Sequence, residues 1–283
     1  MKVKFWGCRG SIPVPDSRML KYGGNTTCVE LILNDRVFII DSGTGIRRLG
    51  EDLVKRKIYD IDVFLTHSHW DHIQGFPFFA PIYLKKARIK IFGRTSSYKQ
   101  LKDIFTSQMS YEFFPVSFFD LQSKINFVEV DTQQFGIGHY RIKIIQTNHP
   151  IFTVGIRVEN NEESFVFMTD NELNDNNPKT SRSEFVKFCE GAQYLIHDAQ
   201  FTEDEYRKRR GWGHSTFEQA IALAGDSGVK NLGLFHHDPN RRDDELRGKE
   251  IELKKLCKKK RRKFKIFAVR EMDEIDLQDC QKS

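Results

Sequence analysis

The chain has 283 residues, carries a formal net charge of +6 and is 39% hydrophobic. No apolar run approaches the roughly 18 residues that a membrane span requires, and residues 1–20 lack the apolar core of a signal peptide. These features exclude integral membrane and secreted classes, so we expect a soluble, cytoplasmic protein with no membrane partner. The length permits one large hydrophobic core, and no linker rich in proline, glycine and serine divides the chain. We therefore expect one domain, residues 1–283.

The predicted elements alternate short strands with amphipathic helices. The first is a hairpin of strands Cys28–Leu33 and Val37–Ile40, which turns at Asn34–Asp35. Helices are expected at Ile46–Lys57, Tyr98–Ser107, Ser183–Cys189, Thr216–Gly225 and Asp243–Arg262. No sequence repeat of fixed period is visible.

A run of six residues after a predicted buried strand contains four that can ligate a metal. The strand is Ile61–Thr66, and the run reads His67-Ser68-His69-Trp70-Asp71-His72. Residues i and i+2 of an extended segment point the same way, so His67 and His69 can hold one ion. Asp71 and His72 follow where the loop turns, and can face a second ion. Such a density of ligands rarely serves packing, so we interpret the run as a metal site rather than a polar loop.

Three more polar residues each follow an apolar strand. They are His149 after Tyr140–Gln146, Asp170 after Phe165–Thr169 and His236 after Leu232–Phe235. Singly, such a residue is more often an ordinary turn or cap residue. As an ordered set with the six-residue run, they predict ligands that converge from several strands on one sheet edge. A binuclear centre needs such a set, including a carboxylate that bridges the two ions.

In their order and spacing these residues resemble the metallo-β-lactamase fold superfamily, whose hallmark His-x-His-x-Asp-His is met by residues 67–72. The resemblance covers nearly the whole chain, from Asp41-Ser42-Gly43-Thr44-Gly45 to the last strand. It implies an α/β fold, a four-layer αββα sandwich of two mixed sheets flanked by helices. Carried over position by position, it implies one ion on His67, His69 and His149, a second on Asp71, His72 and His236, and a bridge at Asp170.

The resemblance also narrows the reaction. β-Lactamases of this fold generally place a cysteine near the position of the bridging aspartate, so Thr169-Asp170 favours the hydrolases and phosphodiesterases of the superfamily. The phrases Leu195–Gln200 and Gly213–Thr216 resemble paired motifs of tRNA-processing RNase Z. They imply that Asp198 orients His214, which protonates the leaving oxygen and accelerates its departure by about 10² to 10⁴. The structural alternative for His214 is a residue that precedes a helix, with Ser215 or Thr216 as the N-cap.

Three phrases are similar to the RNase Z-like and phosphonate-pathway-like phosphodiesterases of bacteria, some of which hydrolyse cyclic nucleotides. The phrases are Phe5–Pro13, Tyr22–Thr26 and Phe235–Pro239. Only 20 residues separate His149 from Asp170, which leaves no room for the long arm that clamps tRNA in RNase Z. The basic phrase that follows the last metal histidine of RNase Z is replaced here by His237-Asp238-Pro239. Both departures disfavour a tRNA substrate.

Residues 105–119 form an aromatic insertion between the six-residue run and His149. Its large apolar residues are Phe105, Met109, Tyr111, Phe113, Phe114, Phe118 and Phe119. Two interpretations stay open: a hydrophobic cluster that packs on the sandwich, and a lid or homodimer surface over the site. Trp70 and Trp212 lie beside proposed site residues, where a ring can stack on a base or fill the wall of the cleft.

Positive charge is concentrated near the C-terminus. Eight lysines and arginines lie between Lys254 and Lys263, so the rest of the chain sums to −2 within the total of +6. We prefer a solvated helix end, where basic side chains complement the helix dipole. The alternative is a contact surface for the phosphates of RNA or DNA. The slightly acidic remainder favours a small nucleotide over a long nucleic acid.

The five cysteines show no CxxC spacing, and their number is odd. They are Cys8, Cys28, Cys189, Cys257 and Cys280. We therefore expect free thiols in a reducing compartment.

Together these features predict a binuclear metal-dependent phosphodiesterase that acts on a small, cyclic nucleotide. A hydroxide held between the ions would attack phosphorus, with Asp71, Asp198 and His214 as the catalytic residues. The ions are two divalent transition metals, zinc being preferred over manganese or iron.

Three residues are expected around the ligands rather than among them. Asp41 is expected to orient a ligand, while His237 and Trp212 are candidates for contacts with the substrate. Strand-end position favours His236 over His237 as the ligand. Rival hypotheses are an RNA-processing endonuclease of RNase Z type, a thioester or lactone hydrolase of the same fold, and a nucleotide-sensing protein whose metal site is structural.

Overall fold

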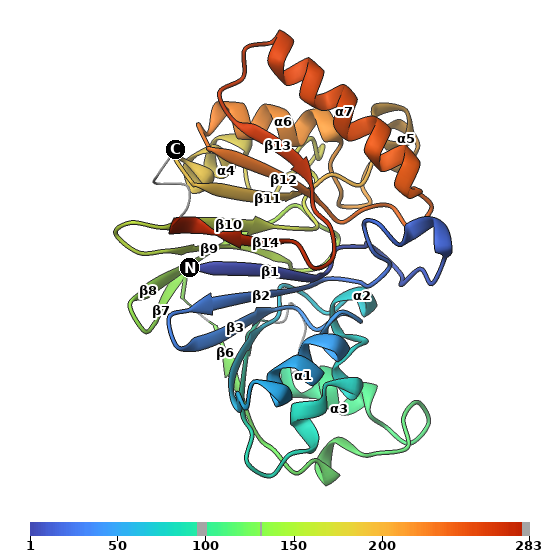
Figure 1. The fold of residues 1–283 in the computed structure, drawn as a ribbon, viewed down its shortest axis with the longest axis vertical. Helices are drawn as coiled ribbons and strands as arrows, with labels where there is room; N and C mark the ends of the chain where they lie inside the picture. Colours follow the sequence, from blue (N-terminus) through green and yellow to red (C-terminus); the bar gives the residue numbers. More distant parts are fainter. Residues whose placement is uncertain (95–100, 131, 279–283) are drawn as a thin grey trace.

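The computed structural model describes residues 1–94, 101–130 and 132–278, in which two seven-stranded sheets face each other (Figure 1). The strand order is β14-β1-β2-β3-β4-β5-β6 in the first sheet and β13-β12-β11-β10-β9-β8-β7 in the second. Helices cover the outer faces of both sheets (Figure 1). The predicted α/β fold, a four-layer αββα sandwich, is confirmed.

Both sheets are mixed. The first comprises β1 (Lys2–Gly7), β2 (Cys28–Leu33), β3 (Arg36–Ile40), β4 (Asp60–Phe64), β5 (Arg88–Gly93), β6 (Lys124–Glu129) and β14 (Glu274–Asp276). The second comprises β7 (Gln134–Ile137), β8 (Tyr140–Gln146), β9 (Val154–Glu159), β10 (Ser164–Met168), β11 (Tyr194–Asp198), β12 (Asn231–Phe235) and β13 (Lys265–Ala268). Strands β3 to β6 and β10 to β13 are parallel, and the other pairs are antiparallel.

The helices lie between or after these strands. They are α1 (Ile46–Lys55), α2 (Trp70–Ile73), α3 (Leu101–Gln108), α4 (Arg182–Cys189), α5 (Glu203–Arg209), α6 (Phe217–Asp226) and α7 (Asp243–Lys259), with 3-10 turns η1 (Ser17–Met19), η2 (Phe76–Phe78), η3 (Ala80–Tyr83) and η4 (Phe118–Asp120). Helices α4, α5 and α6 each begin at a capping box, in which Ser181, Thr202 or Thr216 accepts a bond from a backbone N–H. Among the described residues, no helix combines the length and the apolar character that crossing a membrane demands.

Two helices end earlier than the sequence predicts. Helix α1 ends at Lys55 rather than Lys57, and α7 ends at Lys259 rather than Arg262. In both cases a residue just past the end adopts the left-handed conformation, with φ of 60° at Lys57 and 50° at Arg261. This conformation stops a right-handed helix. For the helix predicted at Tyr98–Ser107, residues 98–100 lie outside the described residues.

A hydrophobic core fills the space between the two sheets. Phe5 and Phe38 come from the first sheet, and Ile142, Ile156 and Phe167 come from the second. Two further cores join the first sheet to α1 and α3, and the second sheet to α4, α6 and α7. Strand β5, next to the edge strand β6, has only one covered face, and its buried and outward residues alternate accordingly.

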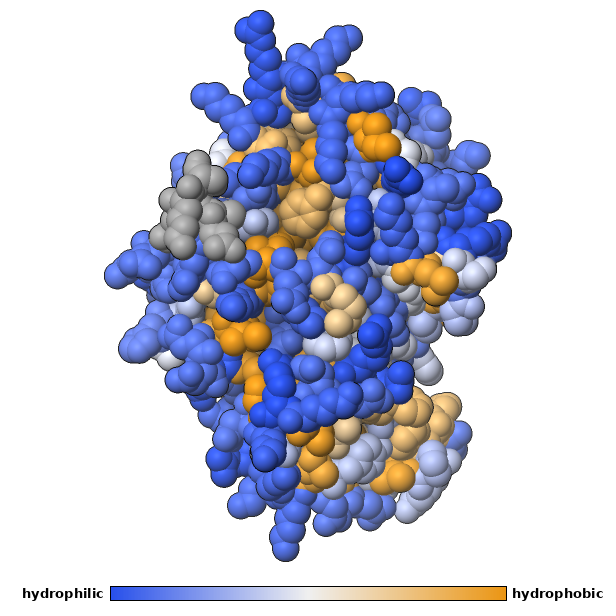
Figure 2. All heavy atoms as spheres, viewed as in Figure 1, coloured by the Kyte–Doolittle hydropathy of each residue, from blue (hydrophilic) through white to orange (hydrophobic). Residues whose placement is uncertain are grey.

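The aromatic insertion 105–119 divides into two parts. Phe105, Met109 and Phe118 are buried and join the core beneath α3. Tyr111, Phe113 and Phe119 are exposed. The prediction of a packed cluster is therefore confirmed for the first part. Figure 2 shows apolar side chains gathered at the lower end of the molecule, where α3 lies in Figure 1.

The parallel strands bring the predicted site residues to one edge of each sheet. Asp41 follows β3, the run from His67 follows β4, Asp170 follows β10, and His236 follows β12. Asp198 is the last residue of β11. Because the carboxyl ends of parallel strands share an edge, these residues meet where the two sheets approach each other.

The basic cluster Lys254–Lys263 lies near the opposite edge. Lys258 and Arg262 line a cavity together with Tyr194 and Asn231, the first residues of β11 and β12. The cluster is thus separated from the predicted site by the length of these strands. Cys8, Cys28, Cys189 and Cys257 are free thiols, as predicted, and Cys280 lies outside the described residues.

Phe167→Ala should lower the free energy of unfolding by about 3–5 kcal/mol, because it empties a site between the sheets. The Phe167 ring is fully buried, with its centroid 5.1 Å from that of Phe235. Urea denaturation followed by circular dichroism measures the change. Phe119→Ala is the matched control, since Phe119 is 74% exposed and its removal should matter by less than about 0.5 kcal/mol. Equal changes in the two variants would contradict this account of the core.

Candidate metal centre

The six-residue run folds into a loop followed by the single turn of α2. The His67 and His72 rings lie 4.1 Å apart between centroids, and the His67 and His69 rings 4.7 Å apart. Asp41 holds both ends of the loop. Its carboxylate accepts a bond from the Thr66 backbone N–H at 2.7 Å and lies 2.7 Å from His72 Nδ1.

The second sheet contributes the remaining residues. His149 Nε2 lies 3.0 Å from His69 Nδ1, and His236 Nε2 lies 3.2 Å from Asp71 Oδ2. The carboxylate of Asp170 lies between the two groups. Its oxygens are 3.7 Å from His67 Nε2, 3.3 Å from His72 Nε2 and 3.5 Å from His236 Nε2.

These side chains form overlapping groups that can hold metal ions. Within each group among the described residues, the ligand atoms all lie within 4.8 Å of one another. The groups are His67, His69 and His149; His67, His72 and Asp170; Asp71, His72 and His236; and Asp170, Asp198, His214 and His236. All seven residues that the sequence predicts as ligands are thus brought together, and Asp170 is shared by two groups.

The electrostatics of the cluster are those of a site for cations. Burial opposes a charge on His72, yet the carboxylates of Asp71 and Asp170 raise its pKa well above the ordinary value. Burial likewise opposes charge on His236, but Asp170 and neighbouring carboxylates raise its pKa to about 9. Burial lowers the pKa of His149 to about 4. The buried carboxylates therefore attract positive charge, while burial keeps other imidazoles, such as that of His149, neutral and free to donate lone pairs.

The hydrogen bonds of the rings fit transition-metal ligation. His67 Nδ1 contacts Thr66 Oγ1 at 3.1 Å, His72 Nδ1 contacts Asp41, and His149 Nδ1 contacts the Gly213 carbonyl oxygen at 3.1 Å. The opposite atoms His67 Nε2 and His72 Nε2 are buried without a hydrogen-bond partner among the described residues. Histidines that bind metal are oriented in this way by their second ring nitrogen.

Two glycines allow the histidine rings to approach the backbone. A Cβ atom at Gly213 would lie 2.1 Å from His149 Nδ1, and one at Gly10 would lie 2.4 Å from His236 Nδ1. Gly213 also has a φ of +86°, which side chains rarely adopt. The rings of His149 and His236 are therefore packed directly against main chain.

The backbone is strained where three strands reach the centre. Asp41, Asp170 and His236 have φ values of 61°, 53° and 59°. Residues other than glycine make unfavourable steric contacts at positive φ, and residues strained in this way are often found at functional sites. The three strained positions are all strand ends that supply a predicted site residue.

His214 lies at the edge of the cluster, against Asp198. His214 Nδ1 is 2.7 Å from Asp198 Oδ2, and its ring stacks on that of His236 at 4.9 Å. The Asp198 carboxylate is itself fixed, because it accepts bonds from the backbone N–H groups of Asp170 and Ser215. The pair predicted from the sequence is therefore in contact and beside the ligand groups.

His237 differs from expectation. It is 1% exposed, its Nε2 lies 2.8 Å from the Val269 carbonyl oxygen, and no ligand group among the described residues includes it. Burial, followed by the charge of Arg9, lowers its pKa to about 3. This neutral, enclosed ring has no surface for a phosphate, which corrects the expected substrate contact. Trp212, by contrast, is 60% exposed beside His214.

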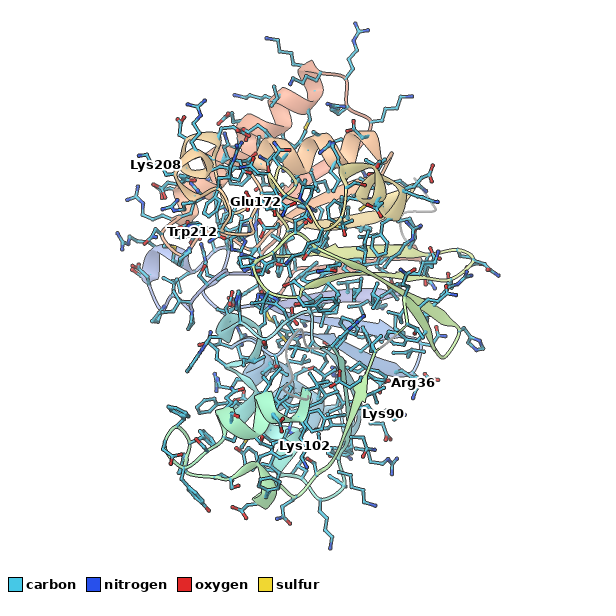
Figure 3. The ribbon with its side chains drawn as sticks, turned by 180° about the vertical axis from the view of Figure 1, so that it is seen from behind. Arg36, Lys90, Lys102, Glu172, Lys208 and Trp212 are labelled. Atoms are coloured by element: carbon cyan, nitrogen blue, oxygen red, sulfur yellow. The ribbon has the colours of Figure 1, made fainter. Side chains whose placement is uncertain are left out.

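Sequence reasoning missed Glu172, which organises the loop before His214. The Glu172 carboxylate is buried and accepts bonds from the backbone N–H groups of Gly211 and Gly213 and from the Tyr206 hydroxyl. Figure 3 shows Glu172 in the same upper part of the molecule as Trp212 and Lys208, far from Arg36, Lys90 and Lys102. Through Gly213, this carboxylate positions both His149 and His214. A carboxylate two residues after Asp170 was the only signal.

Comparison with known proteins places this centre in a family. A family model, the Beta-lactamase superfamily domain, matches residues 36–237. The chain belongs to this superfamily. The Ribonuclease Z of Clostridium kluyveri is 24% identical to this superfamily member over 287 aligned positions, which cover 85% of this chain and 89% of the relative.

Solved structures show the same fold as this superfamily member. A diphosphatase from the PhnP family aligns with a TM-score of 0.71 at 15% identity, covering 97% of both chains. The short form of human tRNase Z aligns with a TM-score of 0.65 at 20% identity, covering 98% of this chain and 99% of that one. The predicted membership of the metallo-β-lactamase fold superfamily is confirmed by the family model, and the Ribonuclease Z relative supports the RNase Z-like branch.

Asp170→Ala in this superfamily member should release most of the bound metal, because Asp170 is the carboxylate that both predicted ion positions share. Metal content after reconstitution is measured by elemental analysis, with about two ions per chain expected for the unaltered protein. Asp62→Ala, which removes a carboxylate of β4 that belongs to none of the ligand groups, is the control and should keep both ions. Full metal content in the Asp170 variant would show that the bridge is misassigned.

Glu172→Gln should lower kcat by roughly 10- to 100-fold through misplacement of His214, while metal content stays unchanged. The amide nitrogen of glutamine would face a backbone N–H that the carboxylate now satisfies. Tyr206→Phe is the matched control, since it removes one donor and leaves both oxygens in place. The His214 imidazole proton signals in NMR should shift in the Glu172 variant alone. Unchanged turnover in both variants would show that Glu172 contributes to stability and does not position His214.

Proposed function

We propose that the protein hydrolyses a small phosphodiester, a cyclic nucleotide being the preferred type, at a centre of two divalent transition-metal ions. The observation that carries the proposal is the contact of His214 Nδ1 with Asp198 Oδ2 at 2.7 Å, beside the shared carboxylate of Asp170. Hydrolysis of a phosphodiester with an alkyl leaving group needs a proton at the departing oxygen. The Asp198 and His214 pair is suited to deliver it.

His214 acts as the general acid in this proposal. Its Nδ1 proton is held by Asp198, so Nε2 is the nitrogen that remains for the substrate. The stacked contact with His236 and the Gly213 turn fix the ring plane. The proton therefore leaves from a defined atom toward the oxygen that departs from phosphorus.

The metal ions would be held as the resemblance implies. One would lie on His67, His69 and His149, the second on Asp71, His72 and His236, with Asp170 shared. When bound, they supply a water of lowered pKa and positive charge toward the phosphoryl oxygens. Zinc, manganese and iron all suit imidazole and carboxylate ligands, and zinc is our choice. Asp41 keeps His72 and the loop in place for this set.

A small substrate is supported by the interval between His149 and Asp170. These residues are joined by the antiparallel pair β9 and β10, whose register runs from Ser164 opposite Glu159 to Phe167 opposite Ile156. The turn between them spans only residues 160–163. No extended arm leaves the molecule in this described interval. The basic cluster at the opposite sheet edge is also too distant to share a phosphate with the centre.

A nuclease of RNase Z type is the second candidate, favoured by the name of the Clostridium kluyveri relative. The basic residues Arg207, Lys208 and Arg209 in the last turn of α5 also come shortly before His214 in the sequence. Arg209 lies over the rings of Phe201 and Trp212, at 5.1 and 5.9 Å, five residues before His214. A thioester hydrolase has no such support, because a thiolate is a good leaving group and needs the Asp198 and His214 pair less. A lactone opens to an alkoxide, so a lactone hydrolase is distinguished by assay of a lactone rather than by this pair.

His214→Ala separates acid catalysis from metal chemistry. Hydrolysis of a 3',5'-cyclic nucleotide should fall by about 10² to 10⁴, since its alkoxide leaves poorly without a proton. An aryl diester with a nitrophenolate leaving group should be affected far less. Both rates come from one metal-loaded preparation, so metal content is common to both. Asp198→Asn should show the same pattern more weakly.

Two results would overturn parts of the proposal. Equal losses of hydrolysis rate on both diesters would mean that His214 positions the phosphate or supports the fold, rather than acting as an acid. Efficient cleavage of a tRNA precursor, with cyclic nucleotides untouched, would replace the small-substrate proposal with the nuclease.

A further inference from the structure

A pocket of about 620 Å³ lies beside the candidate metal centre and is not used by the chemistry described above. We call it the aromatic pocket and define it by Trp70, Phe78, Arg94, Phe113, Phe114 and Phe152. Its volume is within the range of about 300–1,000 Å³ that is usual for small-molecule sites. It is large enough for a nucleoside.

The aromatic pocket adjoins the centre through residues next to two of the proposed ligands. Trp70 and Ser68, which both line it, alternate in sequence with His69. Ile151 and Phe152 also line it, and they follow His149 by two and three residues. Since His69 Nδ1 and His149 Nε2 are 3.0 Å apart, the two loops meet at the ligands. A group in the pocket can therefore be covalently attached to a phosphate at the centre.

Three rings of the aromatic pocket are largely exposed to solvent, which is unfavourable for apolar side chains, and packing of the core does not require it. Trp70 is 71% exposed, Phe78 57% and Phe113 73%. The core beneath α3 is already filled by Phe76, Phe105 and other buried residues. Apolar rings that gather at the mouth of a pocket mark a binding site.

The arrangement of the rings suits a flat ligand. Phe78 and Phe114 meet edge to face at 5.4 Å, and the Arg94 guanidinium lies over the Phe152 ring at 5.1 Å. A planar group can stack on exposed aromatic faces. Arg94 adds donors that can reach a ring nitrogen or a ring carbonyl.

We propose that the aromatic pocket binds a planar aromatic group of the phosphodiester, of the nucleobase class, and so selects substrates that carry one. This inference rests on the proposed function and specifies its substrate. The phosphate would lie at the metal centre, with the base directed past His69 toward Phe113 and Phe78. The His149 ring lies 4.9 Å from the His69 ring and 5.4 Å from the His214 ring, and His214 does not line the pocket. Proton delivery and base binding therefore use different residues.

The test uses Phe113→Ala and Phe78→Ala in the metal-loaded protein. The KM for 3',5'-cyclic AMP should rise by about 5- to 100-fold in each, the range expected when a ring that stacks on a base is removed, with kcat within about twofold. Binding of adenosine, measured by calorimetry, should weaken by a similar factor. Tyr111→Ala is the matched control, because Tyr111 is 73% exposed in the same insertion but does not line the pocket.

The outcomes separate this inference from the proposed function. If adenosine binding depends on Phe113 but the protein hydrolyses no phosphodiester, the subsite is supported and the proposed function is contradicted. Phosphodiester hydrolysis with the same KM in all variants, or a wild type that does not bind adenosine, would overturn the subsite alone. A dimer that dissociates on Phe113→Ala with unchanged KM would show that a second copy covers the rings, and would also overturn it.

Discussion

The structure depends on keeping one buried carboxylate among histidines from both sheets. Asp170 is 2% exposed, and its oxygens lie within 4 Å of nitrogens from β4 and β12 loops alike. A carboxylate in that position is stable only beside positive charge. The adjacent carboxylates of Asp41 and Asp71 increase this requirement. The centre is therefore suited to cations, and the two sheets bring their carboxyl edges together around it.

The rest of the fold orients the side chains of the centre. The rings of His67, His72 and His149 are oriented by their Nδ1 atoms, and for His72 and His149 the partner of that nitrogen comes from a distant part of the chain. Asp41 reaches His72 across 31 positions, and Gly213 reaches His149 across 64. The inter-sheet bond from the Val154 backbone N–H to the Thr66 carbonyl oxygen ties the two loops together. The centre is consequently complete only when the two sheets have packed together.

Much of this could be predicted because the signals are local. The run from His67 to His72 and the strand-end positions of Asp170 and His236 are visible in short stretches of sequence, and parallel strands then determine where they meet. The role of Glu172 could not be predicted, since its partners Tyr206 and Gly211 are over 30 residues away and give it meaning only in three dimensions.

The sequence also could not show which aromatic residues of the insertion 105–119 are buried and which are exposed. Phe105 and Phe113 look alike in sequence, and only the position of α3 against the first sheet decides that one is buried and the other exposed. The same holds for His236 and His237, which are neighbours in the chain. The strained turn at His236 directs one ring to Asp71 and leaves the next against Val269.

The left-handed turns at Asp41, Asp170 and His236 also bear on attempts to engineer this protein. Each costs the folded state about 1–3 kcal/mol, and glycine would relieve that cost. A selection for heat resistance alone would favour glycine at these three places and so delete the groups that the centre requires. Thermal robustness and turnover are thus opposed at the same backbone positions. Stabilising changes should be sought elsewhere, for example at Gly248 inside helix α7, where an added Cβ atom meets open space and alanine should stabilise the helix by about 0.5–1 kcal/mol.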